Sequence, residues 1–187
     1  AGAGNPLLAK AGTVTVSGTS TVAHAGTISG FAKAVSYSIV DSAGNALGAA
    51  GAAYNEAADI TITGSLTFAK AEIIKEAGNS GSTSYVIYDS AAAIATAVGA
   101  TTGLIADVQT LNGATTVTAN TNATFAQAAT IAGIAKAVVY NISDEQANIP
   151  GSTTAALNEA VNIVITNDVT FAQAKIIDDA TNSGSNT

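Results

Sequence analysis

Three aspartates recur in register along the sequence, and their carboxylates are the first groups to consider for chemistry. Asp41, Asp89 and Asp144 each end a Tyr-x-Ile-x-Asp segment and precede an alanine-rich run. A row of carboxylates supplies the hard oxygen ligands that suit calcium. Asp also accepts hydrogen bonds from the free amides at a helix start. We favour capping of the helix that follows, because the sequence has neither a calcium-binding glycine-rich nonapeptide nor an EF-hand loop.

A second pair of carboxylates, Asp178-Asp179, lies near the carboxyl end of the sequence. Two adjacent acidic side chains are also calcium candidates, since calcium prefers oxygen ligands. The surrounding residues favour a helix with a solvated acidic face, which is the simpler interpretation.

Three tyrosines share the spacing of the aspartates. Tyr37, Tyr85 and Tyr140 each lie four residues before Asp41, Asp89 or Asp144. A row of exposed aromatic rings would suit stacking on sugars. Tyrosine is also common in strands, where its ring packs against the pleated surface. We favour packing over ligand binding.

No residue set in the sequence supports catalysis. His24 is the only histidine, and the equivalent places in the repeat described below hold Lys70, Gln127 and Gln173. A catalytic or metal-binding histidine would not be interchangeable with lysine and glutamine. No Ser/His/Asp set and no phosphate-binding glycine loop is present. We therefore expect no enzyme activity and no cofactor, with calcium as the one ion left open.

An internal repeat dominates the sequence. Residues 13–84 align without a gap with residues 116–187, and 37 of these 72 positions are identical. A shorter period lies inside, because the pattern Thr-[Val/Phe]-Ala-x-Ala begins at positions 21, 67, 124 and 170. We assign 1–12 to an N-terminal lead-in, 13–115 to a first repeat with an insertion at 99–114, and 116–187 to a second, incomplete repeat.

Each half of the repeat predicts a strand followed by a helix. Seven segments alternate at period two and are rich in Val, Ile, Thr and Tyr, which is typical of strands: residues 13–18, 35–41, 59–64, 84–89, 115–120, 138–144 and 162–167. Alanine-rich segments with apolar residues at helical spacing lie between them. Thr21, Thr67, Thr124 and Thr170 are placed to cap helices.

A strand and helix cannot bury an apolar face alone, but stacked neighbours can. Strands that are joined by helices must run parallel, with right-handed crossovers. We therefore predict an α/β solenoid of about seven strand–helix coils forming one continuous stack. A doubly wound α/β domain needs no sequence repeat, and a parallel β-helix is disfavoured by the helical segments. The alanine content fits helices packed close to the sheet, with larger core residues at Ile28, Phe31, Leu47, Phe68, Ile73, Ile94, Phe125, Ile131, Ile134, Phe171 and Ile176.

The charge balance restricts the partners. The formal net charge is −7, and all six basic residues are scattered lysines. Nucleic acid requires a clustered basic surface, so we expect no nucleic-acid binding. The longest apolar stretch, residues 91–106, is short and rich in small residues, so we expect no membrane insertion. The absence of cysteine excludes disulfides and thiolate metal sites.

The Ala/Thr/Gly-rich, cysteine-free, acidic repeats, with Thr-[Val/Phe]-Ala-x-Ala followed by Tyr-x-Ile-x-Asp, resemble tandem-repeat regions of large bacterial cell-surface proteins. These include S-layer-like and adhesin-like proteins of cyanobacteria and other aquatic bacteria. The resemblance covers the chain from about residue 13 onward. It implies an extracellular, cell-surface location and a structural or adhesive role.

Three functions follow as hypotheses. The first is a self-associating structural protein whose coils stack end to end in a surface layer or filament. The second is an adhesin or stalk module that binds glycan or another surface protein, through the tyrosine row or the 99–114 insertion. The third is a polysaccharide-cleaving enzyme of the β-helix type. The absence of arginine argues against the third, because such enzymes pair carboxylates with basic residues.

Overall fold

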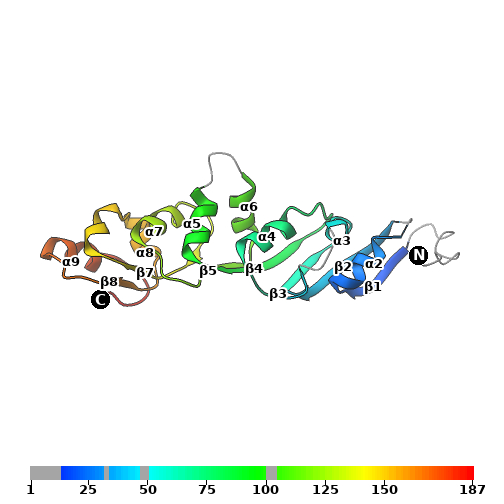
Figure 1. Cartoon of the computed structure of the whole chain (residues 1–187), viewed down its shortest axis with the longest axis horizontal. Coiled ribbons are helices and arrows are strands. Elements are labelled where there is room, and N and C mark those ends of the chain that lie inside the picture. The colour runs from blue at the N-terminus through cyan, green and yellow to red at the C-terminus, as the bar shows by residue number, and fades with distance from the viewer. Residues whose placement is uncertain (1–13, 32–33, 47–50, 100–104) are drawn as a thin grey trace. The chain divides into compact units, whose positions relative to one another are not determined.

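The computed structural model describes residues 14–31, 34–46, 51–99 and 105–187 of the chain, and strands and helices alternate along it (Figure 1). The lead-in at 1–12 and the core candidate Leu47 lie outside these residues. All seven predicted strands are present, and the sixth is split in two. The strands are β1 Val14–Ser20, β2 Val35–Ser42, β3 Ile60–Leu66, β4 Thr83–Asp89, β5 Thr116–Ala119, β6 Val138–Val139, β7 Ile142–Asp144 and β8 Ile163–Ile165.

Short helices occupy the segments between the strands. The α-helices are α2 Val22–Ile28, α3 Gly51–Asn55, α4 Phe68–Lys75, α5 Ala91–Gly99, α6 Ile105–Gly113, α7 Phe125–Ile131, α8 Thr154–Glu159 and α9 Phe171–Asp178, and the 3₁₀ helix η2 spans Gln146–Gly151. None of these described helices is long and apolar enough to cross a membrane.

The strands form a parallel α/β sheet in chain order. The larger sheet has the order β1-β2-β3-β4-β5-β6, and β7 pairs with β8 in a second sheet. The β1–β2, β2–β3, β5–β6 and β7–β8 pairs are all parallel, as the helical connections require. The predicted parallel arrangement is therefore confirmed. The helices between the strands show that the chain is not a pure parallel β-helix.

The chain divides into two compact units, one that ends at Val86 and one that starts at Ile87. This division falls inside β4 rather than at the repeat boundary between residues 115 and 116. Compactness in space and repetition in sequence therefore divide the chain at different places.

Two glycines explain why the strands of the first repeat are longer than those of the second. Gly18 in β1 and Gly64 in β3 have φ angles of +89° and +81°, which side chains other than glycine rarely tolerate. The register of β1 on β2 shifts around Gly18, and the strand continues to Ser20. The second repeat has Thr121 and Asn167 at these positions, and no described non-glycine residue has a positive φ. The equivalent strands β5 and β8 accordingly end at Ala119 and Ile165.

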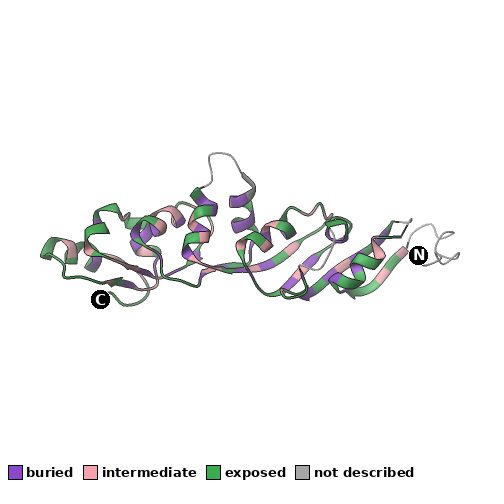
Figure 2. Ribbon diagram, viewed as in Figure 1, coloured by how far each residue is buried: buried purple, intermediate pink, exposed green. Residues whose placement is uncertain are grey.

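Strands β2 to β5 bury alternate residues on one face. In β2, burial alternates along the strand, with Val35, Tyr37, Ile39 and Asp41 inside. Ile39 pairs with Ile60 and Ile142 pairs with Ile163, and all four isoleucines are 0% exposed. Burial of each such side chain stabilises the fold by about 1.5–3 kcal/mol. On the opposite face Val40, Tyr88, Val139 and Val164 are exposed. Figure 2 shows buried and exposed segments along the strands.

The predicted core is correct in part. Ile94, Phe125 and Ile131 are buried, whereas Ile28, Phe68 and Ile134 are half-buried. The prediction was wrong for Phe31, Ile73, Phe171 and Ile176, which are exposed.

The error at the isoleucines is one of helical phase. In α4 and α9 two isoleucines are adjacent, and only the second of each pair, Ile74 or Ile177, is buried. Neighbouring helical residues point about 100° apart, so only one can face the sheet. The periodicity alone did not identify which one.

The insertion near 99–114 contributes a helix to the core. Residues 100–104 lie outside the described residues, and α6 follows them. Thr110 and Leu111 in α6 are 0% exposed, and α6 contacts α5. The described part of the insertion therefore packs against its neighbour rather than projecting as a binding loop.

Candidate functional site

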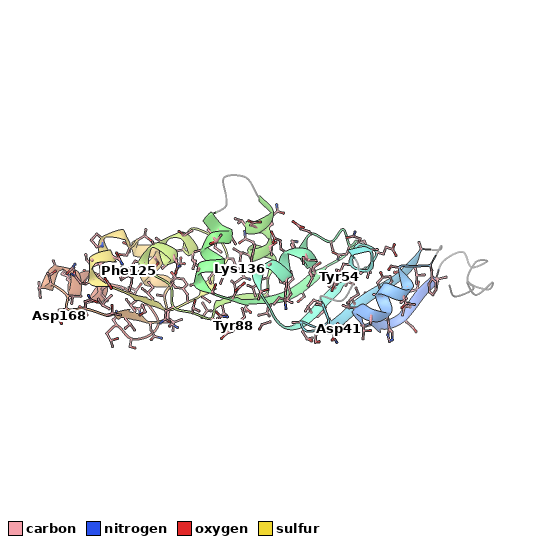
Figure 3. All side chains as sticks on the ribbon, in the orientation of Figure 1. Asp41, Tyr54, Tyr88, Phe125, Lys136 and Asp168 are labelled. Atoms are coloured by element: carbon pink, nitrogen blue, oxygen red, sulfur yellow. The ribbon has the colours of Figure 1, made fainter. Side chains whose placement is uncertain are left out.

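The repeated aspartates join each strand to the helix before it. Asp41 in β2 accepts a hydrogen bond through Oδ2 from the Val22 amide, the first residue of α2, at 2.9 Å. Asp144 in β7 accepts one from the amide of Phe125, the first residue of α7, also at 2.9 Å. Asp41 and Phe125 are labelled in Figure 3. The predicted capping role is therefore correct, but the predicted target was wrong. Parallel stacking places each aspartate against the preceding helix, 19 residues back in sequence.

The other oxygen of each carboxylate is also occupied. Asp41 Oδ1 accepts from the Ser42 amide at 2.8 Å and from Asn45 Nδ2 at 2.9 Å. Asp144 Oδ1 accepts from the Glu145 amide at 2.8 Å and from Asn148 Nδ2 at 2.7 Å. Every oxygen therefore faces an N–H donor, which is the environment of a structural carboxylate.

These donors set the acidity of the two carboxyl groups. The Asn45 side chain, with the Val22 and Ser42 amides, lowers the pKa of Asp41 against the opposing effect of burial. Burial raises the pKa of Asp144, but the hydrogen bonds from Asn148, Phe125 and Glu145 outweigh it, so the net pKa is lowered. Both groups are held ionised because their charged forms accept several hydrogen bonds.

The remaining calcium candidates do not gather into a site. Asp89 Oδ1 accepts from the Ser90 amide at 2.7 Å, and its carbonyl accepts from the Asn120 amide at 2.8 Å. Asp178 and Asp179 are exposed at the C-terminal end of α9, where Asp179 forms a 2.8 Å ion pair with Lys175 that raises the lysine pKa. Among the residues that the structure describes, no three His, Cys, Asp or Glu side chains cluster as metal ligands.

The three repeated tyrosines lie in the core. Tyr37, Tyr85 and Tyr140 are 2%, 1% and 0% exposed. The Tyr37 hydroxyl donates to the Ala53 carbonyl at 2.7 Å, and the Tyr140 hydroxyl donates to the Ala156 carbonyl at 2.8 Å. Rings buried in this way have no free face for a sugar, so packing accounts for their recurrence.

Burial also changes the acidity of the tyrosines. It raises the pKa of Tyr85 to about 12, and it raises the pKa values of Tyr37 and Tyr140 together with the nearby charges of Glu56 and Glu159. Tyr88, which our sequence analysis did not single out, is 50% exposed on the open face of β4.

Asparagines that our sequence analysis did not identify as functional also link successive strand–helix pairs. Asn55 Oδ1 accepts from the Gly78 amide, and its equivalent Asn158 accepts from the Thr181 amide, both at 2.9 Å. Asn79 Nδ2 donates to the Ala58 carbonyl at 3.3 Å, and Asn182 Nδ2 donates to the Val161 carbonyl at 3.0 Å. The retained identity of these positions between the repeats was the available signal.

The Asn-Ser-Gly-Ser motif at 79–82 and 182–185 fits closely against the preceding turn. The Ser82 amide donates to Asp59 Oδ1 at 2.8 Å, and the Ser185 amide donates to Asn162 Oδ1 at 3.0 Å. A Cβ on Gly81 would lie 2.5 Å from the Ala58 carbonyl oxygen, and one on Gly184 would lie 2.3 Å from that of Val161. Glycine is therefore required here by close approach of the backbone.

The predicted threonine caps are in place. Thr21, Thr124 and Thr170 accept hydrogen bonds from the amides of His24, Gln127 and Gln173, and Gln127 and Gln173 complete capping boxes. Thr67 occupies the same position without a side-chain bond. His24 is exposed and contributes its backbone amide to this cap, as its glutamine counterparts do.

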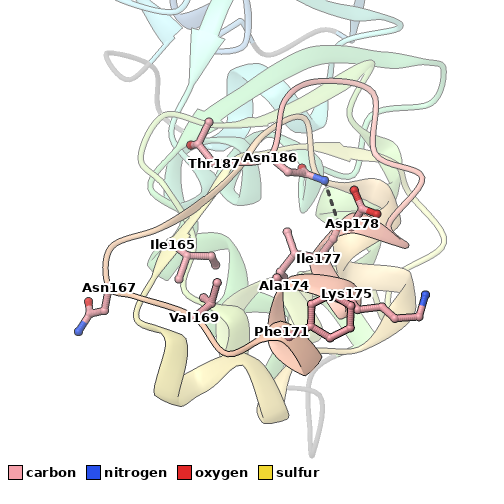
Figure 4. Close-up of a pocket in the computed structure, with 10 residues that line it drawn as sticks. All are labelled: Ile165, Asn167, Val169, Phe171, Ala174, Lys175, Ile177, Asp178, Asn186 and Thr187. Atoms are coloured by element: carbon pink, nitrogen blue, oxygen red, sulfur yellow. Dashed lines mark hydrogen bonds between the residues drawn. The ribbon is translucent and has the colours of Figure 1, made fainter.

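An apolar pocket of about 520 Å³ lies between β8 and α9 (Figure 4). Ile165, Val169, Phe171 and Ile177 form much of its wall, and Asn186 Nδ2 closes one side by donating to the Ile177 carbonyl at 2.9 Å. Phe171 is 87% exposed, whereas Phe125, at the same position 46 residues earlier, is 0% exposed. The surface around Phe171 is therefore exposed in the pocket, whereas the equivalent surface around Phe125 is buried in the same unit.

Comparison with protein-family models, with curated proteins and with solved structures finds no match for this chain. The hydrogen-bonding side chains described above hold one strand–helix pair against the next, and their oxygen atoms are directed at backbone amides and amide side chains.

Proposed function

We propose that the chain is an extracellular structural repeat protein that forms or extends a cell-surface layer or filament. In this proposal the strand–helix pairs are the coils of an α/β solenoid, and stacking continues from one copy to the next. The chain has no catalytic role and requires no cofactor. Self-association is its principal interaction.

One observation carries the proposal: equivalent bonds hold successive strand–helix pairs together in both repeats. The Asp41–Val22 and Asp144–Phe125 bonds are equivalent, as are the Asn55–Gly78 and Asn158–Thr181 bonds. Repeats that bury their faces against neighbours can be added without changing the rest of the molecule. The sequence resemblance to bacterial surface repeats supports the extracellular setting.

The charge distribution supports an assembling role. Only 10% of the residues are charged, well below the usual quarter of a soluble domain. Low charge weakens the repulsion between copies when faces meet. Apolar side chains such as Phe171 and Ile176 lie exposed near β8 and α9.

Negative-stain electron microscopy of the purified chain over a concentration series, with and without calcium, tests the proposal. We expect fibres or layers with a regular axial repeat that form at higher concentration in both conditions. Isolated particles at every concentration would contradict self-assembly. Assembly only with calcium would show that carboxylates outside the capping network bind the ion.

The second candidate is an adhesin or stalk module that binds glycan or another surface protein. The observation that favours it is the open face of the sheet, where Tyr88 is 50% exposed and Val139 is 51% exposed. An exposed aromatic ring is a suitable platform for a sugar. Binding on a glycan array that is lost on Tyr88→Ala, with Tyr88→Phe as the control, would support this role over assembly.

A further inference from the structure

Helix α4 carries an isoleucine on the side that faces away from the sheet. Ala71 and Ile74 are 0% and 1% exposed and pack inward, whereas Ile73 is 57% exposed. Helix α4 lies between β3 and β4 in the chain, so Ile73 is exposed although strands precede and follow its helix. The equivalent residue of α9, Ile176, is 45% exposed. An exposed isoleucine is therefore a feature of this helix position in both repeats.

Helices α2 and α7 follow the same Thr-[Val/Phe]-Ala-x-Ala motif but have threonine at this position. The Thr27 hydroxyl donates to the Ala23 carbonyl at 3.4 Å, and the Thr130 hydroxyl donates to the Ala126 carbonyl at 3.0 Å. A hydroxyl that bonds within its own helix needs no partner outside it. An isoleucine left in water forgoes the about 1.5–3 kcal/mol that full burial contributes. A contact that covers Ile73 is therefore favourable.

The residues one turn away from Ile73 are small or charged. Ala69 and Ala77 lie four positions before and after it, on nearly the same line of the helix surface. Lys70 lies three positions before and Glu76 three positions after, on opposite flanks of that line. Within the described part of the chain, neither Lys70 nor Glu76 forms an ion pair. The alanines permit close approach of a second helix, and the two charges are available to it.

Two copies of this helix fit each other in antiparallel orientation. When Ile73 of one copy lies against Ile73 of another, residues at equal distances before and after the isoleucine come level with each other. Lys70 of each copy is then level with Glu76 of the other, and twofold symmetry makes this pair twice. A parallel orientation would instead place lysine beside lysine and glutamate beside glutamate, which is unfavourable.

Helix α9 has the same exposed isoleucine without this complementarity. Its flanking residues are Gln173 and Asp179, so the flanks hold no cation, and both residues are engaged within the chain. Gln173 donates through Nε2 to the Gln146 carbonyl at 3.2 Å, and Asp179 pairs with Lys175 at 2.8 Å. Of the two helices, α4 is therefore the one whose charges match a second copy of itself.

We propose that the outer face of α4, formed by Ala69, Lys70, Ile73, Glu76 and Ala77, binds the same face of a second copy of the chain in antiparallel orientation. This inference deepens the proposed function and rests on it for its setting, because a layer requires contacts beside the direction of stacking. The face belongs to a helix of 8 residues. It is small beside the roughly 1,200–2,000 Å² of a stable interface, so one contact is weak and many act together in an array.

Disulfide trapping tests the contact, because the chain has no cysteine of its own. The variant Ile73→Cys places one thiol at the centre of the contact, where packed helices bring facing residues within disulfide range. Under mild oxidation with copper phenanthroline, we expect a covalent dimer to form about tenfold faster than from Thr27→Cys, the exposed equivalent position in α2. A mixture of Lys70→Cys and Glu76→Cys chains should give mainly the mixed dimer.

Charge reversal tests the orientation. In the Ile73→Cys background, Lys70→Glu should slow trapping about tenfold, because two acidic side chains then meet at each end of the contact. Adding Glu76→Lys restores opposite pairs, so the doubly reversed chain should be trapped at the original rate, which also shows that the fold tolerates these changes. Equal trapping of Ile73→Cys and Thr27→Cys, or indifference to Lys70→Glu, would overturn the proposal.

The outcome is separable from that of the proposed function. Trapping through Ile73→Cys without fibres in the electron microscope would uphold the α4 contact and contradict end-to-end assembly. Fibres from a chain that is not trapped would uphold assembly and overturn the α4 contact. If both hold, Ile73→Asp chains should form single fibres that no longer associate side by side.

Discussion

At the scale of single residues, the recurring carboxylates are structural groups whose charge is satisfied by amides. Asp41 and Asp144 each accept hydrogen bonds from two backbone amides and one asparagine. Hydrogen bonds to charged groups contribute about 1.5–3 kcal/mol each in favourable settings. The same geometry makes these oxygens poor calcium ligands, since a metal would have to displace the amides.

The acidity of these carboxyls predicts the response of stability to acid. The pKa values of Asp41, Asp59 and Asp144 lie below the ordinary 3.8 in the folded chain. Their contribution is therefore complete above pH 3.8 and is lost as the pH falls through the lower folded values. Urea unfolding over a pH series should show a free energy of unfolding that declines only in this acid range.

The variant Asp41→Asn/Asp144→Asn provides the control for the acid prediction. It should be less stable near neutral pH and should show a flatter decline in acid, because two of the titrating groups are gone. The prediction would be contradicted if the wild-type free energy of unfolding increased on acidification. It would also be contradicted if the variant lost stability in acid as steeply as the wild type.

At the scale of elements, small residues set how closely one strand–helix pair approaches the next. Gly81 and Gly184 lie against carbonyl oxygens of the preceding turn, where no Cβ fits. Gly18 and Gly64 act differently, through positive φ angles that keep β1 and β3 continuous. The four glycines are therefore required for two different reasons: Gly81 and Gly184 by close approach of the preceding turn, and Gly18 and Gly64 by their own backbone conformation.

Substitution of Gly81 tests the close approach between neighbouring pairs. Gly81→Ala should lower the free energy of unfolding by about 1–3 kcal/mol, because the new Cβ would lie 2.5 Å from the Ala58 carbonyl oxygen and the Asp59 carboxylate. Gly26→Ala is the matched control, since nothing lies within 4 Å of a Cβ there. That helical substitution should stabilise the chain by about 0.5–1 kcal/mol. Chemical denaturation that ranks the two variants in the opposite order would refute the packing argument.

At the scale of the whole molecule, two compact units reuse the same set of contacts. One ends at Val86 and the other starts at Ile87. In repeat proteins stability is the sum of local terms and nearest-neighbour contacts. A substitution that removes one contact should therefore destabilise the structure near that contact and leave the rest of the chain unaffected.

Asp144→Ala tests this locality. The variant removes the cap of the Phe125 amide and the bond to Asn148. The free energy of unfolding should therefore fall by about 1–3 kcal/mol. Hydrogen exchange should accelerate in α7 and β7, while the amides of β2 and β3 keep their protection. Asp168→Ala, at an exposed residue with no hydrogen bond or ion pair among those described, is the control. A uniform loss of protection along the chain would mean that it unfolds as one unit.

The sequence determined the alternation of strands and helices, the parallel pairing and the threonine caps. These features depend on local periodicity, on the length of the connections and on side chains within three residues of their partners. Identities between the repeats also fall on residues whose side chains make long-range bonds, such as Tyr37, Asn55 and Asn79, but our sequence analysis did not identify these bonds. Their partners lie from 16 to 23 residues away, so the identities alone did not show what these residues contact.

Only the tertiary structure decided which helix each aspartate caps, which isoleucine of a pair faces the sheet, and which of the repeated phenylalanines is exposed. Asp144 reaches back to Phe125 because parallel stacking places the end of a strand over the previous helix start. Phe125 and Phe171 are the same residue in the same motif, yet one is 0% and the other 87% exposed. Their difference arises from what lies next to each in space, and the residue's own sequence context does not contain that information.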